Sequence, residues 1–130
     1  GSYEINFNVD LNSSVSFLLS LGNLKEKIYL SYDKPAQNLV VDRSGAGIDF
    51  ANLLRQKIYS PYVAKVGQAT KFQILVDKTS MEIFVDDGER VITTLFFPKY
   101  QYDLLRIEGD GTASAISNFN LKSISKSINR

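Results

Sequence analysis

The chain has 130 residues, of which 44% are hydrophobic and 22% are charged, which is the size and composition of one domain with its own core. Its formal net charge is +1, and its Lys and Arg residues are scattered among acids, which argues against a nucleic-acid-binding surface. The absence of Cys and His excludes disulfides, thiol chemistry and histidine-based acid–base or metal chemistry. No apolar run is long enough to predict a membrane-spanning helix.

Apolar and polar residues alternate with a period of two throughout the chain, which predicts an all-β protein. Ten strands are expected, at residues 3–10, 14–21, 26–33, 38–42, 57–63, 71–77, 81–86, 89–97, 103–108 and 113–124. Turn-forming clusters separate several of them, at residues 22–23, 33–35, 44–47 and 109–111. Short strands with such turns indicate a two-sheet antiparallel β-sandwich.

Two of the expected strands contain segments that are apolar on both faces, Ser16–Leu21 and Val91–Phe97. Such strands are expected in the middle of a sheet, covered on one side by the second sheet and on the other by a partner domain. The only segment with a helical pattern is Phe50–Gln56, which is too short to form a stable helix alone.

A hairpin is predicted around Asp87-Gly88, because this pair suits a type I′ turn with positive φ at both central residues. The register that follows pairs Phe84 with Val91, Ile83 with Ile92 and Glu82 with Thr93. Glu82 is then the one carboxylate inside an otherwise apolar strand. We therefore expect Glu82 to be partly shielded and paired with a cation, most simply Arg43.

Two ordered motifs carry a resemblance to a known family. The first is VDRSGAG at residues 41–47, followed by Phe50. The second runs through Val76-Asp77, Ser80, Glu82-Ile83-Phe84-Val85, Asp86-Asp87-Gly88-Glu89, Thr93-Thr94 and Phe97-Pro98. Together they resemble the C-terminal β-sandwich domain of glycoside hydrolase family 32, which includes invertases, levanases and inulinases. The segment LKSIS at residues 121–125 is similar to the terminal strand of that domain.

The resemblance implies an all-β sandwich of the concanavalin or lectin-like jelly-roll type. Gly1-Ser2 is interpreted as a cloning remnant, and residues 3–130 as the single C-terminal domain of a larger fructan hydrolase. In that family the catalytic acids belong to an N-terminal five-bladed propeller, within Asn-Asp-Pro, Arg-Asp-Pro and Glu-Cys motifs, and none of these motifs occurs here. No catalytic residue and no cofactor is therefore expected in this chain.

The resemblance further implies that the domain stabilises the propeller and contacts substrate or a second subunit, in a secreted or periplasmic enzyme. The family 66 carbohydrate-binding modules are also similar, which suggests fructan or fructose as a ligand. Asp42, Arg43 and Glu82 are the candidate carbohydrate-binding residues, because a carboxylate beside a guanidinium offers acceptors and donors for vicinal hydroxyls.

Three alternatives stay open. Asp42 and Ser44 would cap a turn while Arg43 pairs with Glu82 or Asp77, leaving a purely structural motif. An unrelated lectin or adhesion sandwich would have the same strand pattern. A calcium loop at Asp86-Asp87-Gly88 is disfavoured, because the spacing lacks alternating acid ligands.

Aromatic side chains are the other candidates for sugar contacts, and the chain has no Trp. Five Phe residues occupy strand positions and are expected in the core, namely Phe7, Phe17, Phe72, Phe84 and Phe96. Four Tyr residues lie near loops and are candidate sugar contacts, namely Tyr59, Tyr62, Tyr100 and Tyr102.

Overall fold

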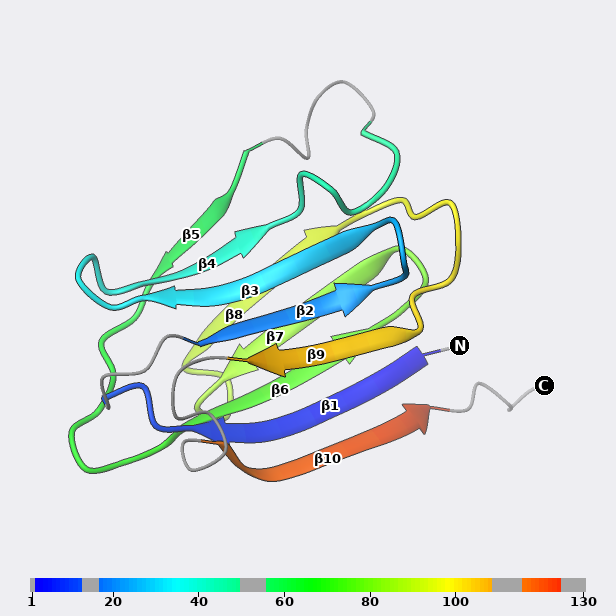
Figure 1. The fold of residues 1–130 in the computed structure, drawn as a ribbon. Helices are drawn as coiled ribbons and strands as arrows, with labels where there is room; N and C mark the ends of the chain where they lie inside the picture. Colours follow the sequence, from blue (N-terminus) through cyan, green and yellow to red (C-terminus); the bar gives the residue numbers. More distant parts are fainter. Residues whose placement is uncertain (1, 13–16, 50–55, 109–115, 125–130) are drawn as a thin grey trace.

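The structure is a computed structural model that describes residues 2–12, 17–49, 56–108 and 116–124. Ten strands form two antiparallel five-stranded sheets, packed one behind the other in Figure 1. Sheet 1 has the order β10 (Ile116–Ile124), β1 (Ser2–Val9), β6 (Thr70–Val76), β7 (Ser80–Val85) and β8 (Arg90–Leu95). Sheet 2 has the order β5 (Ile58–Pro61), β4 (Asn38–Asp42), β3 (Lys27–Asp33), β2 (Leu18–Gly22) and β9 (Leu104–Glu108).

The predicted sandwich and its ten strands are confirmed, with ends that differ by a few residues. Some expectations fall outside the described residues: positions 14–16 and 113–115 of two strands, the turn at 109–111 and residues 50–55 of the helical pattern. No helix in the described part of the chain is long and apolar enough to cross a membrane.

The core lies between the sheets and follows the period of two. In β6 the side chains of Phe72, Ile74 and Val76 are buried, while the residues between them are partly or fully exposed. Phe7, Phe17 and Phe72 pack together at its centre, with the ring centroid of Phe7 5.2 Å from that of Phe72 and 5.9 Å from that of Phe17. Inward-facing apolar side chains from both sheets therefore supply the main stabilising term. The expectation that Phe84 also lies in the core is wrong, because its side chain is only partly buried and points to the outer face of β7.

The β7–β8 hairpin has the predicted register, including Phe84 opposite Val91 and Glu82 opposite Thr93. The φ angles of Asp87 and Gly88 are 59° and 96°, as a type I′ turn requires. The amide of Glu89 donates to the carbonyl of Asp86 at 3.4 Å across this turn. Local turn chemistry therefore sets the register of the pair.

The expectation that Glu82 is shielded and paired with Arg43 is wrong. Glu82 is exposed, and no ion pair joins its carboxylate to any residue that the structure describes. Its neighbours in sequence, Met81 and Ile83, are buried on the opposite face of the strand. Because side chains alternate between faces, an apolar sequence context here does not mean an apolar environment.

The two segments that are apolar on both faces, Ser16–Leu21 and Val91–Phe97, have different positions in the sheets. β2, which holds Leu18–Leu21, lies between β3 and β9, as expected for a central strand. β8 is instead an edge strand of sheet 1, so the expectation of a central position is wrong for Val91–Phe97. Its residues Val91 and Leu95 are 50% and 53% exposed, because their side chains point to the outer face of sheet 1, away from sheet 2.

Candidate functional site

Asp42 and Ser44 form a capped turn at the end of β4. Oδ1 of Asp42 accepts hydrogen bonds from the Ser44 amide at 3.0 Å and from Ser44 Oγ at 2.8 Å. This is the turn-capping arrangement that the sequence left open as an alternative. Burial would raise the pKa of Asp42, but the two Ser44 hydrogen bonds and the charge of Lys57 outweigh it and lower the pKa.

Arg43 reaches from the same turn to the backbone of β8. Its Nη1 donates to the Leu95 carbonyl at 3.2 Å, which joins the end of sheet 2 to the edge of sheet 1. Glu82 projects from the outer face of β7 and makes no hydrogen bond or ion pair with Asp42 or Arg43. The three candidate residues are thus not gathered in one bonded group, and their role in sugar binding stays a prediction.

The four candidate tyrosines divide into two buried and two exposed side chains. Tyr62 and Tyr102 are each only 5% exposed, so the expectation that they offer rings to a sugar is wrong. The Tyr102 hydroxyl donates to the Ala46 carbonyl, and its ring stacks on Phe96 with centroids 5.0 Å apart. Burial, with a smaller contribution from the charge of Glu26, raises the pKa of Tyr102.

Tyr62 belongs to a polar group beneath the β7–β8 turn. Its hydroxyl donates to Asp86 Oδ2 at 2.5 Å and lies 3.0 Å from Thr70 Oγ1. Burial and the Asp86 carboxylate raise its pKa to about 12. Lys65 completes the group, with Nζ 3.8 Å from Asp86 and 2.8 Å from Glu89. These contacts hold the turn on the sandwich, which is a structural task.

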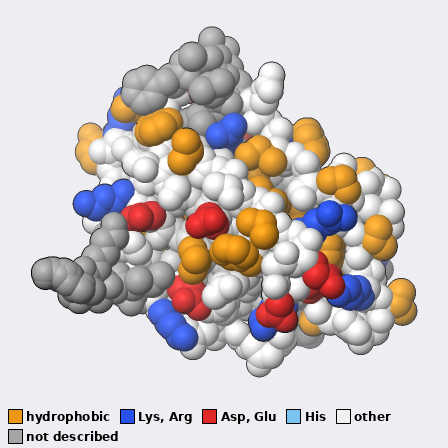
Figure 2. All heavy atoms as spheres, turned by 180° about the vertical axis from the view of Figure 1, so that it is seen from behind, with side chains coloured by type: hydrophobic (Ala, Val, Ile, Leu, Met, Phe, Trp, Pro, Cys, Tyr) orange, Lys and Arg blue, Asp and Glu red, His pale blue; other side chains and the backbone are white. Residues whose placement is uncertain are grey.

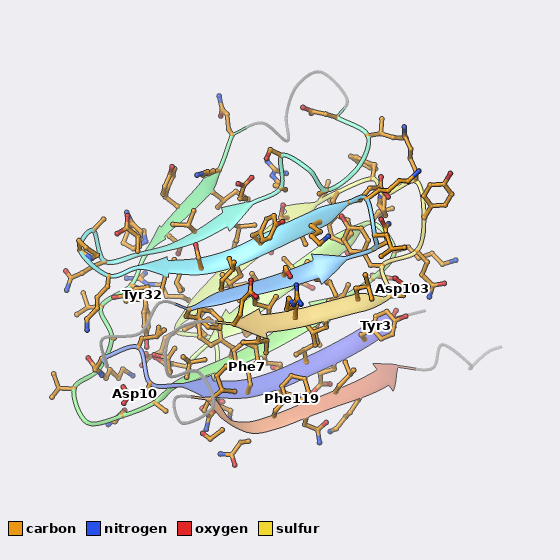
Figure 3. The ribbon with its side chains drawn as sticks, viewed as in Figure 1. Tyr3, Phe7, Asp10, Tyr32, Asp103 and Phe119 are labelled. Atoms are coloured by element: carbon orange, nitrogen blue, oxygen red, sulfur yellow. The ribbon has the colours of Figure 1, made fainter. Side chains whose placement is uncertain are left out.

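A concave surface lies at one end of the sandwich. A hollow of about 290 Å³ opens between the start of β1, the β6–β7 turn and residues 96–102, and it is lined by Tyr3, Asp77, Lys78, Thr79, Tyr100 and Gln101 among others. We call it the Tyr100 hollow. A second hollow, of about 380 Å³, continues on the other side of Tyr100 towards Asn23 and Asp103. Figure 3 shows Tyr3 and Asp103 at this same end of the molecule.

The buried carboxylate of Glu26 fixes the backbone of Lys99 and Tyr100 beside the hollows. Glu26 is 8% exposed, and it accepts hydrogen bonds from the Lys99 amide at 2.9 and 3.0 Å, from the Tyr100 amide at 3.2 Å and from Asn23 Nδ2 at 2.9 Å. Asn23 Nδ2 also donates to the Tyr100 carbonyl at 3.1 Å. Both backbone polar groups of Tyr100 are therefore fixed by the β2–β3 turn.

Glu26 stays ionised in this position. Burial acts to raise its pKa, but the hydrogen bonds from Lys99, Asn23 and Tyr100 outweigh burial and lower it. Sequence reasoning recognised the turn at Gly22-Asn23 but not the carboxylate that follows it. The available signal was Asn23 three residues before an acid, since Asn23 Oδ1 accepts from the amides of Lys25 and Glu26.

Three carboxyl groups have pKa values that are shifted downwards. Hydrogen bonds from Asn6 and Gln73 lower the pKa of Glu4, and the pKa values of Glu26 and Asp42 are lowered as described above. A carboxylic acid that donates a proton near neutral pH needs a raised pKa. Among the residues that the structure describes, no three acidic side chains gather closely enough to hold a metal ion.

Comparisons with known proteins agree with this architecture. The family model described as "Glycosyl hydrolases family 32 C terminal" matches residues 1–123. The extracellular exo-inulinase of Aspergillus niger is 26% identical over 132 residues, covering 95% of this chain and 25% of that protein. A levanase of Bacillus sp. (strain L7) is 32% identical over 104 residues, covering 75% of this chain and 11% of that protein. The chain thus spans about a quarter or less of the length of these relatives.

Two solved structures share the fold. The exo-inulinase from Aspergillus awamori aligns with a TM-score of 0.76 and 22% identity, covering 92% of this chain and 24% of that one. The sucrose-6-phosphate hydrolase from Lactobacillus gasseri also gives 0.76 and 22%, covering 95% of this chain and 25% of that one. With the family match over nearly its whole length, the chain belongs to the family of C-terminal domains of family 32 glycosyl hydrolases.

Proposed function

We propose that this domain is the non-catalytic accessory domain of a glycoside hydrolase acting on β-fructofuranosidic bonds, and that it packs against and stabilises the propeller-shaped catalytic domain. The family membership supports this proposal, as do relatives named exo-inulinase and levanase. Those relatives are several times longer than this chain, which leaves room in them for a separate catalytic domain.

The observation that carries the proposal is a group of four apolar residues on the outer face of sheet 1, Leu75, Phe84, Val91 and Leu95, which we call the outer apolar cluster. Ser80, Glu82 and Thr93 are interspersed among them on the same face. In the strand pairing, Phe84 lies opposite Val91. Glu82, on the same face of β7 as Phe84, lies opposite Leu75. Figure 2, seen from behind the view of Figure 1, shows hydrophobic side chains gathered near the middle of the visible face with carboxylates beside them. The outer face of an antiparallel sheet is ordinarily polar, so such a cluster suits contact with another domain.

The catalytic domain of the parent enzyme is the partner that we assign to this outer apolar cluster. In the isolated chain, where that partner is missing, we expect the cluster to promote self-association of two copies. Secretion or a periplasmic location is part of the same proposal, supported by relatives named extracellular exo-inulinase. The choice among sucrose, inulin and levan would be made in the catalytic domain.

The test compares the full-length enzyme with its variants. Phe84→Lys and Leu95→Lys place charges in the outer apolar cluster, and Val66→Lys is the matched control, because Val66 is 91% exposed on a turn outside the cluster. We expect the cluster variants to lower the melting temperature and shorten the thermal half-life of fructosidase activity, while the control leaves both unchanged. Equal stability in all three variants would contradict the assignment of this face.

The absence of catalysis is tested on the 130-residue chain itself. We expect no release of reducing sugar from sucrose, levan or inulin, because the carboxyls with shifted pKa values are all shifted downwards and held in hydrogen bonds. Release of reducing sugar in proportion to the protein concentration, in both wild type and Arg43→Ala, would contradict the proposal that the chain is non-catalytic.

Fructan binding is the second candidate function, favoured by the exposed ring of Tyr100 beside a hollow that has both apolar and polar lining residues. Binding through Asp42, Arg43 and Glu82 is a separate proposal for the same function. The bonds that occupy Asp42 and Arg43 make it the weaker of the two. Titration of Arg43→Ala with levan tests it directly.

A further inference from the structure

We propose that the Tyr100 hollow binds a neutral, hydroxyl-rich saccharide, with the ring of Tyr100 stacked against a C–H face of one sugar unit. The choice of a fructan as that saccharide rests on the proposed function. The site itself is argued from the contacts around Tyr100, and it is separate from the Asp42-Arg43 turn.

Tyr100 is an exposed aromatic side chain on a fixed backbone. Its side chain is 65% exposed, although its amide and its carbonyl are both held by the buried pair Glu26 and Asn23. The amide of the preceding Lys99 is held by Glu26 as well. Because the backbone that carries the ring is already fixed, ligand binding has to restrict only the two side-chain torsions of Tyr100, and this partial preorganisation favours binding.

Tyr3 is a second aromatic side chain lining the hollow, and it is partly exposed. The stacked rings of Phe96 and Tyr102, inclined by only 6°, also border the hollow but are buried, so they support its wall and do not contact the sugar. Gln101 Nε2 donates to the Tyr3 hydroxyl at 3.0 Å, which ties this wall to the residue next to Tyr100. Tyrosines combine a large apolar face with a polar tip, and sugars likewise present C–H faces and hydroxyls.

Polar side chains of several kinds surround this aromatic surface. Lys78 lines the hollow with an ammonium group, Thr79 with a hydroxyl and Gln101 with an amide. The carboxylate of Asp77 lies beside them, and its Oδ1 already accepts from Ser2 Oγ at 3.2 Å and from the Lys78 amide at 2.8 Å. Acceptors and donors are both needed to bind hydroxyls, which act as both. Lys78 and Lys99 are balanced in part by Asp77, so the hollow does not present one sign of charge that would select an ion over a neutral ligand.

The size of the hollow agrees with a small sugar segment. Its volume of about 290 Å³ lies at the lower limit of the roughly 300–1,000 Å³ of pockets that enclose drug-sized ligands. One or two sugar units are therefore the expected occupant, with the rest of a chain passing over the second hollow beside Tyr100.

Titration calorimetry of the 130-residue chain with levan and with inulin oligosaccharides tests the inference, with dextran as the unrelated polysaccharide. Tyr100→Ala removes the ring but leaves the backbone bonds to Glu26 and Asn23 possible, and Tyr100→Phe keeps the ring. Tyr59→Ala is the matched control, because Tyr59 is 59% exposed on the edge strand β5 and does not line the hollow.

We expect wild type, Tyr100→Phe and Tyr59→Ala to bind a fructan alike, and Tyr100→Ala to bind it about tenfold or more weakly, the value of one well-placed aromatic contact. No heat with either fructan at millimolar concentration would overturn the inference, and so would equal binding by Tyr100→Ala. Loss of binding in Arg43→Ala alone would move the site to the Asp42-Arg43 turn. None of these results depends on whether the domain stabilises a catalytic partner, which is measured separately on the full-length enzyme.

Discussion

Replacing Glu26 by Ala should destabilise the domain more than replacing any exposed carboxylate. The substitution leaves the amides of Lys99 and Tyr100 and one amide proton of Asn23 without their acceptor. A hydrogen bond to a charged group contributes about 1.5–3 kcal/mol, and such contributions are not additive. Because Lys99 and Tyr100 are exposed, water replaces part of the loss, and we expect a net cost of about 3 kcal/mol.

For a domain of this size that cost corresponds to a fall in melting temperature on the order of 10 °C. Circular dichroism during heating measures the global effect, and amide hydrogen exchange at Lys99 and Tyr100 measures the local one. Glu82→Ala is the control, since the Glu82 carboxylate is exposed and has no ion-pair partner among the described residues, and it should melt within about 2 °C of wild type. Melting of Glu26→Ala close to wild type, with unchanged exchange at both amides, would refute the reasoning.

Three further predictions follow from single contacts. The folded-state pKa of Glu26 lies below its ordinary 4.5. The ionised carboxylate therefore stabilises the fold fully above about pH 4.5, and this stabilisation is lost as the pH falls through the lower folded-state pKa. Glu26→Gln should remove this pH dependence from an acid-unfolding curve. Gly47→Ala should lower the free energy of unfolding, measured with urea, by more than about 1 kcal/mol, because φ is 153° and the new Cβ would lie 2.2 Å from the Phe97 carbonyl oxygen. Gly45→Ala is the control, because its new Cβ would make only an ordinary contact at 3.7 Å. Tyr62→Phe should lower the free energy of unfolding by about 1–2 kcal/mol. In an ultraviolet titration, the variant should lack the phenol that ionises at about pH 12 in wild type. In wild type the raised pKa of Tyr62 gives stability that is complete below pH 10 and is lost as pH rises through about 12.

The strand order along the chain could be predicted because its causes are local. Alternation with a period of two indicates where a strand runs, and the Asp87-Gly88 pair determines the hairpin register, so Glu82 opposite Thr93 was predictable. The ordered motifs from Val41 to Pro98 were enough to indicate the family, since they depend only on spacing in the sequence.

The environments of individual side chains could not be predicted in this way. Which face of β7 is covered depends on where the second sheet packs, and this left Glu82 exposed, although its sequence neighbours are buried. The edge position of β8 depends on sheet order, and the contact of Arg43 with the Leu95 carbonyl joins residues that are 52 apart in the chain.

The Tyr100 hollow depends most strongly on tertiary structure. Sequence identified Tyr100 as a ring near a loop, but it gave no reason to connect that ring with Glu26, whose carboxylate accepts from an amide 74 residues away. Only the packing of the β2–β3 turn against the segment after β8 brings these groups together. A long-range contact of this kind leaves no periodic or turn-type signal in the sequence. It forms only in the folded domain, where burial and hydrogen bonding offset the entropy of closing a long loop.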